Sequence, residues 1–277
     1  MLKYKITIFF IFFIFLYACS KDQEKVVLVK EKNQKQEMIS NYEEGMKALE
    51  IRDYFLASKK FLEAEILFPQ SQWASKSVLM ASYSYYLQDY YSLAIENLKR
   101  YFKTYPNDKN KVYAHYLLAM CYYETIEGEK KDLAPLILSK NELNFIIENY
   151  PESDYAYDAR FKIDLINDIL AAKEVYLGRH YIKKKKWIPA LNRFKNVLED
   201  YETTIHVEEA LHRLVEIYHF LGMENESLKY ASLLGYNYNS SEWYEETYKI
   251  FNKKYEKPIP KNKKENSKIL GKIKSLF

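Results

Sequence analysis

The two cysteines and five histidines of this 277-residue chain are the first candidates for nucleophiles and metal ligands. The five histidines do not group as a ligand set: His212 and His219 share a helix face, seven residues apart, but no third ligand lies near them in the sequence. The motifs of phosphate-binding loops, serine hydrolases and zinc proteases are missing. Cys121 lies in an apolar helical run, where a free cysteine packs as a small hydrophobe. The sequence therefore predicts a binding protein that is not an enzyme, with no catalytic residue, metal or bound cofactor.

The other cysteine, Cys19, ends an apolar segment near the start of the chain. Two lysines precede the run 6–16, which has the length of the hydrophobic region of a secretory signal and is too short to span a bilayer. The run leads into the tetrapeptide "LYAC", which resembles a bacterial lipobox, although Tyr17 is bulkier than usual there. The resemblance implies cleavage after Ala18, a diacylglycerol on the Cys19 sulfur and an acyl chain on its new amino group. The alternatives are an uncleaved membrane anchor or a secretory signal with a chance cysteine.

A cysteine modified in this way would hold the chain on a membrane. Each buried methylene contributes ~0.8 kcal/mol, so three acyl chains give an effectively permanent attachment. Bacterial lipoproteins of the inner membrane often carry aspartate where this chain has Ser20. The resemblance therefore implies the periplasmic face of the outer membrane of a Gram-negative bacterium. Residues 19–40, which are polar, are expected to form a flexible tether between the lipid and the folded domain.

Positive charge is concentrated at the C-terminal end of the chain. The formal net charge is +4, yet residues 253–277 alone hold nine lysines against two glutamates. The rest of the mature chain is therefore acidic overall and lacks the cationic stripe that a nucleic-acid-binding domain needs. We expect no nucleic-acid partner, and we expect residues 237–277 to form a lysine-rich extension of unknown role.

The dipeptide Phe-Pro or Tyr-Pro recurs through the middle of the chain, at 68–69, 105–106 and 150–151, and Tyr201 marks an equivalent later point. Proline cannot continue a helix and disfavours helix in the residue before it. Dipeptides of this kind that recur at so long an interval indicate an array of structural repeats, each of which ends at one of these dipeptides or at Tyr201.

Small and bulky residues follow a fixed spacing within these repeats. Gly45 and Ala57 are twelve residues apart, as are Gly178 and Ala190, and a phenylalanine follows each alanine by four residues. This pattern resembles tetratricopeptide repeats, in which the small residue lets two helices approach and the bulky residue fills the groove beside it. We therefore predict an all-α fold with about five helix pairs in a right-handed superhelix, and a generic helical bundle is the alternative. The repeats are expected at about 41–70, 75–106, 112–151, 155–203 and 206–235, within a domain over 41–236.

Residues 40–235 as a whole resemble the BamD family, lipoproteins of the β-barrel assembly machinery. The most specific stretches are "FPQSQWASKSVLMASYSYYLQDYYSLAIENLKRYFKTYP" and "ARFKIDLINDILAAKEVYLGRHYIKKKKWIPALNRFKNVLEDY". The resemblance implies a scaffold that holds unfolded outer-membrane protein precursors and docks on the barrel subunit BamA, beside the other lipoproteins of the machinery. The alternative is a tetratricopeptide lipoprotein of another envelope machine, such as a pilus-secretin pilotin or a peptidoglycan-linked coordinator. An accessory subunit of an enzyme is a third, weaker possibility.

Two sets of residues are candidates for binding these partners. Arg193 is next to the core residue Phe194, ~100° away around the helix. By resemblance it matches a basic position of the docking surface for BamA, where its planar fork would bind a carboxylate, and a solvated surface arginine is the alternative. The N-terminal repeats carry surplus aromatic residues, of which about half should belong to the core and the rest should line an apolar groove for an extended precursor peptide. These are Trp73, Tyr83, Tyr86, Tyr90, Tyr91 and Tyr113.

Overall fold

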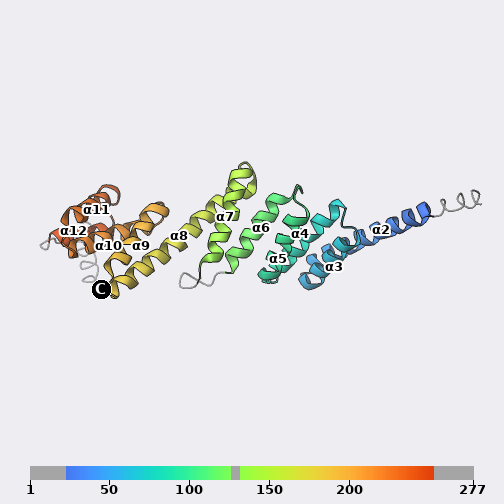
Figure 1. Cartoon of the computed structure of the whole chain (residues 1–277), viewed down its shortest axis with the longest axis horizontal. Helices are drawn as coiled ribbons and strands as arrows, with labels where there is room; N and C mark the ends of the chain where they lie inside the picture. Colours follow the sequence, from blue (N-terminus) through green and yellow to red (C-terminus); the bar gives the residue numbers. More distant parts are fainter. Residues whose placement is uncertain (1–22, 126–131, 253–277) are drawn as a thin grey trace, which may run out of the picture. The chain divides into compact units, whose positions relative to one another are not determined.

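The computed structural model of the protein describes residues 23–125 and 132–252, and over these ranges it contains helices and no strand. Figure 1 labels the helices in chain order. The helices are α2 (Gln23–Glu50), α3 (Tyr54–Leu67), α4 (Gln72–Tyr86), α5 (Tyr91–Thr104), α6 (Lys111–Glu124), α7 (Ala134–Asn149), α8 (Asp154–Lys183), α9 (Trp187–Asp200), α10 (Val207–Phe220), α11 (Glu224–Asn237) and α12 (Glu242–Phe251). The all-α prediction is confirmed. Cys19 and the lysine-rich tail lie outside the described residues.

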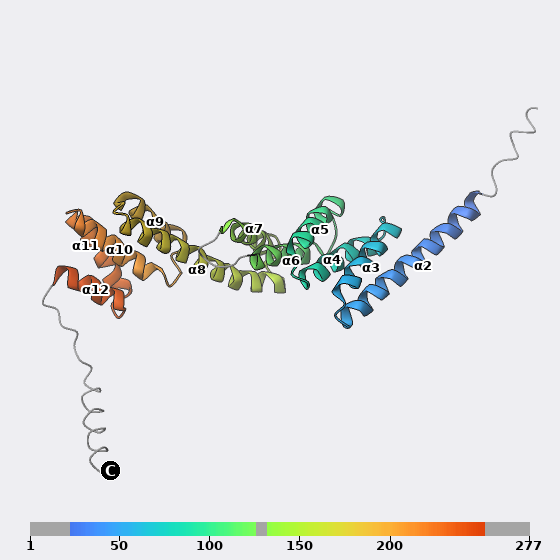
Figure 2. The same cartoon turned by 90° about the horizontal axis from the view of Figure 1, so that it is seen from below.

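Successive helices form five pairs: α2–α3, α4–α5, α6–α7, α8–α9 and α10–α11. Figures 1 and 2 show the two members of each pair side by side. The helices divide into two compact units, which we describe separately. The first unit contains α2 to α7 and the start of α8, through Arg160, and the second contains the remainder of α8, from Phe161, with α9 to α12.

A glycine marks the closest approach of the helices in the first pair and in the fourth. A methyl group added at Gly45 would lie 2.8 Å from Cε1 of Phe61, and one added at Gly178 would lie 2.5 Å from Cζ of Phe194. Both phenylalanines are fully buried. The small-to-bulky spacing of the sequence therefore identifies the two points at which the helices cross.

Four of the pairs share one kind of turn between their helices. The residue just before the last residue of this turn has a positive φ: 62° at Arg52, 59° at Asp89, 55° at Lys185 and 73° at Gly222. The amide of the residue that follows donates to the carbonyl five positions back, at 2.8–3.0 Å, as in the Schellman motif that ends many helices. Only one of these four left-handed positions is occupied by glycine, the residue that adopts this conformation without steric cost.

Helices extend beyond two of the boundaries that the sequence predicts. The sequence predicts a flexible tether over 19–40, but α2 begins at Gln23 and the Met38 side chain is fully buried. Composition was a poor guide here because lysine, glutamate and glutamine suit a solvated tether and a helix equally well.

The repeat domain was also predicted to end at 236, but α12 continues the fold. The Ser241 hydroxyl caps this helix by accepting from the Tyr244 amide at 3.1 Å. Thr247 and Nδ1 of His212 on α10 form a buried hydrogen bond of 2.8 Å. Gly235 of α11 faces the Tyr244 ring, so the small-to-bulky packing of the repeats extends one helix further than the sequence pattern indicated.

Candidate binding surfaces

A pocket of about 380 Å³ in the first unit is lined by the first helices of successive pairs. Its residues come from α2, α4 and α8 and from the start of α6. They are Tyr42, Lys76, Leu79, Met80, Tyr83, Asn110, Tyr113 and Tyr155. Rings and aliphatic chains with a few polar groups are the usual lining of a site that binds an organic ligand or a peptide side chain.

Contacts between rings hold the wall of this aromatic pocket. The Tyr42 ring meets the Phe61 ring of the core edge-on at 5.3 Å and the Trp73 ring at 5.0 Å. The Lys76 ammonium lies 5.3 Å from the centre of the Trp73 ring. Burial raises the pKa of the Tyr113 hydroxyl, so this group stays neutral and able to donate a hydrogen bond. The pocket thus combines ring faces, neutral hydroxyls and one cation.

The six aromatic candidates from the sequence do not share one surface. Tyr83 and Tyr113 line the aromatic pocket, and Trp73 is exposed beside it through its contact with Tyr42. Tyr90 and Tyr91 instead line a separate hollow of about 340 Å³ at the start of α5.

Tyr86 lies between these two groups. Its ring stacks on that of Tyr83, with 6.5 Å between the centroids, and lies 5.8 Å from that of Tyr91. The Tyr91 hydroxyl donates to Asp89 at 2.7 Å within the turn before α5. Tyr86 and Tyr91 therefore have partners within the protein, and Trp73, Tyr83 and Tyr113 are the candidates that the structure brings together.

Sequence reasoning missed Tyr42, Lys76 and Tyr155 as pocket residues. Tyr42 lies near the edge of the expected tether, and Tyr155 belongs to the fourth pair, outside the N-terminal repeats in which the sequence predicts the groove. The signal that would have found them is membership of the first helix of each pair, because these helices supply nearly all of the lining.

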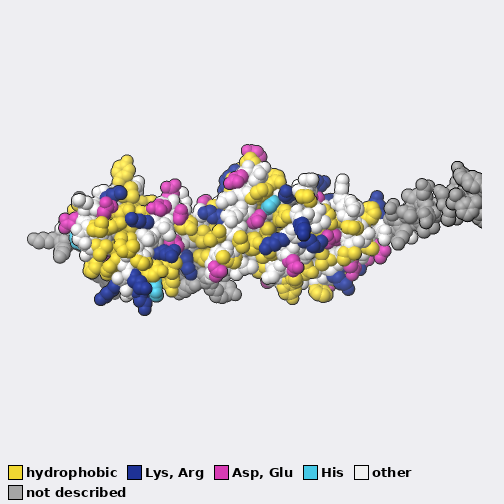
Figure 3. All heavy atoms as spheres, in the orientation of Figure 1, with side chains coloured by type: hydrophobic (Ala, Val, Ile, Leu, Met, Phe, Trp, Pro, Cys, Tyr) yellow, Lys and Arg dark blue, Asp and Glu magenta, His cyan; other side chains and the backbone are white. Residues whose placement is uncertain are grey.

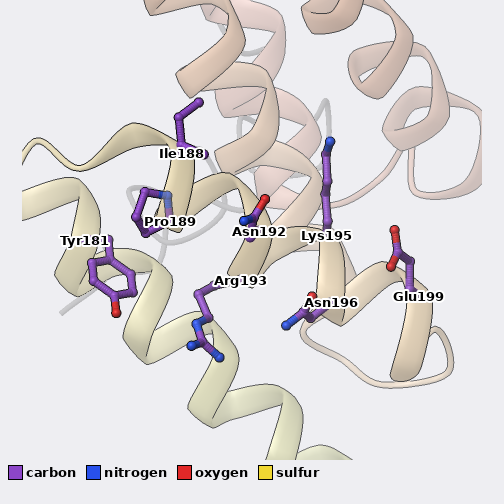
Figure 4. Close-up of a pocket in the computed structure, with 8 residues that line it drawn as sticks. All are labelled: Tyr181, Ile188, Pro189, Asn192, Arg193, Lys195, Asn196 and Glu199. Carbon is purple, nitrogen blue, oxygen red and sulfur yellow. The ribbon is translucent and has the colours of Figure 1, made fainter.

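A second pocket, of about 520 Å³, lies in the second unit and contains Arg193. Tyr181 of α8 and seven residues of α9 line it: Ile188, Pro189, Asn192, Arg193, Lys195, Asn196 and Glu199. Figure 4 shows the Arg193 side chain extending from α9 toward α8, whereas Lys195 extends in the opposite direction. This arginine pocket is thus polar and charged where the pocket of the first unit is aromatic.

Arg193 already has one carboxylate partner within the protein. Its Nη1 donates to the two carboxylate oxygens of Glu174 on α8, at 3.0 and 3.3 Å, and Nδ2 of Asn196 donates to the same carboxylate at 3.0 Å. The Glu174 side chain is 14% exposed, whereas that of Arg193 is 37% exposed. The pair fixes the guanidinium in place and leaves part of its fork open to solvent. Arg193 therefore has a carboxylate partner on α8, which a freely solvated surface arginine lacks.

The remaining chemical candidates have structural surroundings. Cys121 is buried, and burial raises the pKa of its thiol to about 12. His212 bonds to Thr247, and the His219 ring lies 5.6 Å from that of Phe251, so both face α12. Among the residues that the structure describes, no three histidine, cysteine or acidic side chains are placed to hold a metal ion. In that same part of the chain, no helix is long and apolar enough to cross a membrane.

The fold and the pockets define the class of the protein as an all-α repeat protein with two chemically distinct pockets. The family model described as "YfiO: Outer membrane lipoprotein" matches residues 33–233, which is more than half of the chain, and the chain belongs to this family.

Several relatives carry the name outer membrane protein assembly factor BamD, and two of them are similar to this chain over most of its length. The one from Rickettsia prowazekii is 39% identical over 209 residues, which are 76% of this chain and 83% of the relative. The one from Caulobacter vibrioides is 36% identical over 235 residues, which are 85% of this chain and 76% of the relative. A solved tetratricopeptide repeat protein from Parabacteroides merdae aligns with 79% of this chain and 75% of its own, at 14% identity and a TM-score of 0.36.

Proposed function

We propose that this chain is a lipid-anchored scaffold of the β-barrel assembly machinery on the periplasmic face of the outer membrane. It binds unfolded outer-membrane protein precursors in the first unit and docks on a BamA-like barrel subunit with the second, beside other lipoproteins of the machinery. Membership of the outer membrane lipoprotein family and the names of the relatives support the setting. The observation that carries the division of labour is the presence of one aromatic and one charged pocket on different units.

The aromatic pocket suits the end of a β-barrel precursor, which is typically an extended strand rich in aromatic residues. An aromatic side chain of the peptide would pack between the rings of Tyr83 and Tyr113. Neutral tyrosine hydroxyls at the wall would bond to the polar groups of the extended backbone. Lys76, which lines the same pocket, would pair with the free C-terminal carboxylate.

Photocrosslinking of a signal-strand peptide to the lipid-free protein tests this site. We expect crosslinks in α2, α4 and α6. We also expect the double substitution Tyr83→Ala/Tyr113→Ala to weaken peptide binding at least tenfold, because each aromatic contact contributes ~0.5–1.5 kcal/mol in addition to the burial of its area. Tyr90→Ala is the matched control, since Tyr90 is an exposed tyrosine of the same unit that lies outside the pocket. Crosslinks confined to α9–α11 would refute the assignment.

The arginine pocket suits a carboxylate on the barrel subunit, because the exposed part of the Arg193 guanidinium can donate to a second carboxylate while Glu174 holds the side chain in place. Co-purification with the full-length anchored protein tests the partner. We expect a large β-barrel protein to be recovered. Recovery of a pilus secretin or of a peptidoglycan-linked complex in its place would assign the scaffold to another envelope machine.

The anchor is a proposal from the sequence, because Cys19 lies outside the described residues. Mass spectrometry of the mature protein should find a triacylated Cys19 at its N-terminus. Cys19→Ser should leave uncleaved, unlipidated precursor. Any other mature N-terminus in the wild-type protein would contradict the lipobox.

A further inference from the structure

Two helix turns of the second unit bring four lysines next to a group of exposed apolar side chains. Lys183, Lys184, Lys185 and Lys186 form the turn between α8 and α9, and all four are exposed. The structure pairs none of them with a carboxylate among the residues it describes. In Figure 3, dark blue side chains gather where α8 ends, beside hydrophobic side chains of the same unit.

The apolar side chains come from both turns. Ile188, at the start of α9, is 65% exposed, and Phe220, at the end of α10, is 67% exposed. The rings of Trp187 and Phe220 lie 4.6 Å apart between their centroids, which joins the two turns into one surface. Leu221 and Met223, which flank Gly222 in the second turn, are also exposed and extend this surface.

We propose that this basic-apolar tip, formed by residues 183–188 and 220–223, binds an anionic phospholipid surface. Aliphatic and aromatic side chains at the tip would enter the boundary between headgroups and acyl chains, where tryptophan is favoured. The lysines would keep their ammonium groups among the anionic headgroups, and each contributes about fivefold to partition at such a surface. The tip would thus give the second unit a contact with the membrane that is independent of the lipid on Cys19.

The charge pattern favours a lipid surface over a protein partner. Lysine is depleted from protein interfaces, and its strongly hydrated ammonium is costly to bury there. The corresponding turns of the first unit also expose apolar residues, such as Ile51 and Tyr90, but they carry aspartates. Asp53 accepts from the Leu56 amide at 3.0 Å, and Asp89 accepts from the Tyr91 hydroxyl. Exposed apolar turns are therefore common to both units, and among the four turns with a positive φ the cluster of lysines occurs only between α8 and α9.

Fluorescence of Trp187 tests the tip directly. The chain contains three tryptophans, so Trp73→Phe/Trp243→Phe leaves Trp187 as the only one. The mature chain from Ser20 to Phe277, without its lipid, is mixed with vesicles of phosphatidylglycerol and phosphatidylethanolamine that contain brominated acyl chains. We expect quenching and a blue shift with these vesicles, and neither with vesicles of phosphatidylcholine. All variants retain the lysine-rich tail, so binding through the tail alone would occur without quenching of Trp187.

Charge reversal at the tip is the decisive comparison. Lys183→Glu/Lys184→Glu should lower the partition measured by Trp187 quenching at least 25-fold, from about fivefold for each lysine removed. Lys103→Glu/Lys109→Glu changes the net charge equally at exposed lysines of the first unit and should leave the quenching unchanged. Equal quenching in both double variants would overturn the proposal. Self-association or binding to the barrel subunit through the tip, without quenching by vesicles, would assign the surface to a protein partner and would equally overturn it.

Discussion

The pockets of the two units differ in which helix of the pair supplies them. First helices line the aromatic pocket, with Tyr42 on α2 and Tyr83 on α4, whereas α9, the second helix of its pair, supplies most of the arginine pocket. The helix pairs thus present aromatic rings on their first helices in the first unit, and charged side chains on the second helix, α9, in the second unit. In this repeat array, the helix that carries a residue determines which of the two pockets the residue can line.

The cores of the two units are built alike. Phe61 fills the space opened by Gly45 in the first unit, as Phe194 fills the space opened by Gly178 in the second. Substitutions in the core should consequently have equal effects in the two units, whereas substitutions in the pockets should have different ones.

The largest effects are expected in the cores. Phe61→Ala and Phe194→Ala should each lower the free energy of unfolding by ~3–5 kcal/mol, since each removes a fully buried ring and leaves a void against a glycine. Urea unfolding of the lipid-free protein measures this. Phe55→Ala, which removes an exposed ring of α3, is the control and should change stability little. If only one of these two substitutions lowered the free energy of unfolding strongly, the cores of the two units would not be built alike.

Substitution of Arg193 should impair docking on the barrel subunit without affecting peptide binding at the aromatic pocket. Arg193→Glu should reduce recovery of the barrel subunit by about tenfold or more, because it adds repulsion where a charged bond is lost. Part of the repulsion would come from Glu174, so circular dichroism must first show that the variant is folded. Arg193→Lys keeps the charge but loses the fork, and it should have an intermediate effect.

The comparison of the pockets becomes sharper when peptide binding is measured in the same variants. Arg193→Glu should leave crosslinking at the aromatic pocket unchanged, and Tyr83→Ala/Tyr113→Ala should leave recovery of the barrel subunit unchanged. If either substitution impaired both activities, the two pockets would not be separate sites.

Acid should destabilise both units, but salt should distinguish them. Burial alone would raise the pKa of Glu216 on α10, yet His212 and Arg213 outweigh it and hold this pKa at about 2. Asp108 also has a lowered pKa despite its burial, but its donors are neutral: the hydroxyls of Ser75 and Tyr101, at 2.6 and 2.8 Å, and an amide.

Because both pKa values are lower in the folded protein, each carboxylate contributes stability above its unfolded pKa of ~4, and this is lost as pH falls through the folded value. For Glu216, which is partly exposed, we expect ~1 kcal/mol after allowance for solvent. In urea unfolding, Glu216→Gln and Asp108→Asn should each lower the free energy of unfolding more at pH 7 than at pH 3. Added salt should shrink the effect of Glu216→Gln only, because it screens charges. Equal salt dependence would contradict the difference in donors.

The sizes and spacing of residues in the sequence predict how the helices pack, but they do not predict which groups the surface side chains contact. The twelve-residue interval from Gly178 to Ala190 is a local property of one helix pair, so the crossing can be read from the chain. The partner of Arg193 could not be, because Glu174 lies nineteen residues away on another helix and the pairing depends on how both helices are rotated. Tyr83 lies on α4 and lines the aromatic pocket, whereas Tyr90 lies in the turn before α5 and lines a different hollow.

The smallest expected effects concern the shared turns, where the two units differ in residue type at one backbone conformation. A residue with a side chain costs ~1–2 kcal/mol in the left-handed region. Glycine removes this cost, but the net gain is smaller because glycine also has more conformational freedom in the unfolded chain. Lys185→Gly should therefore stabilise the protein by ~0.5–1 kcal/mol, and Gly222→Ala should cost ~1 kcal/mol or more. Asp89→Gly should gain less, because aspartate tolerates this region and Asp89 also accepts the Tyr91 hydroxyl.

Lys184→Gly is the matched control for Lys185→Gly, since it removes a neighbouring exposed lysine of the same turn at a residue without a positive φ. It should lower stability slightly, because there glycine brings only its entropic cost. Urea unfolding of the four variants at one salt concentration measures the differences. Equal effects of glycine at 184 and 185 would show that charge in the lysine cluster, and not the backbone conformation, determines the stability of this turn. A gain at 185 alone would show that the second unit tolerates strain at the position where its exposed tip carries a lysine.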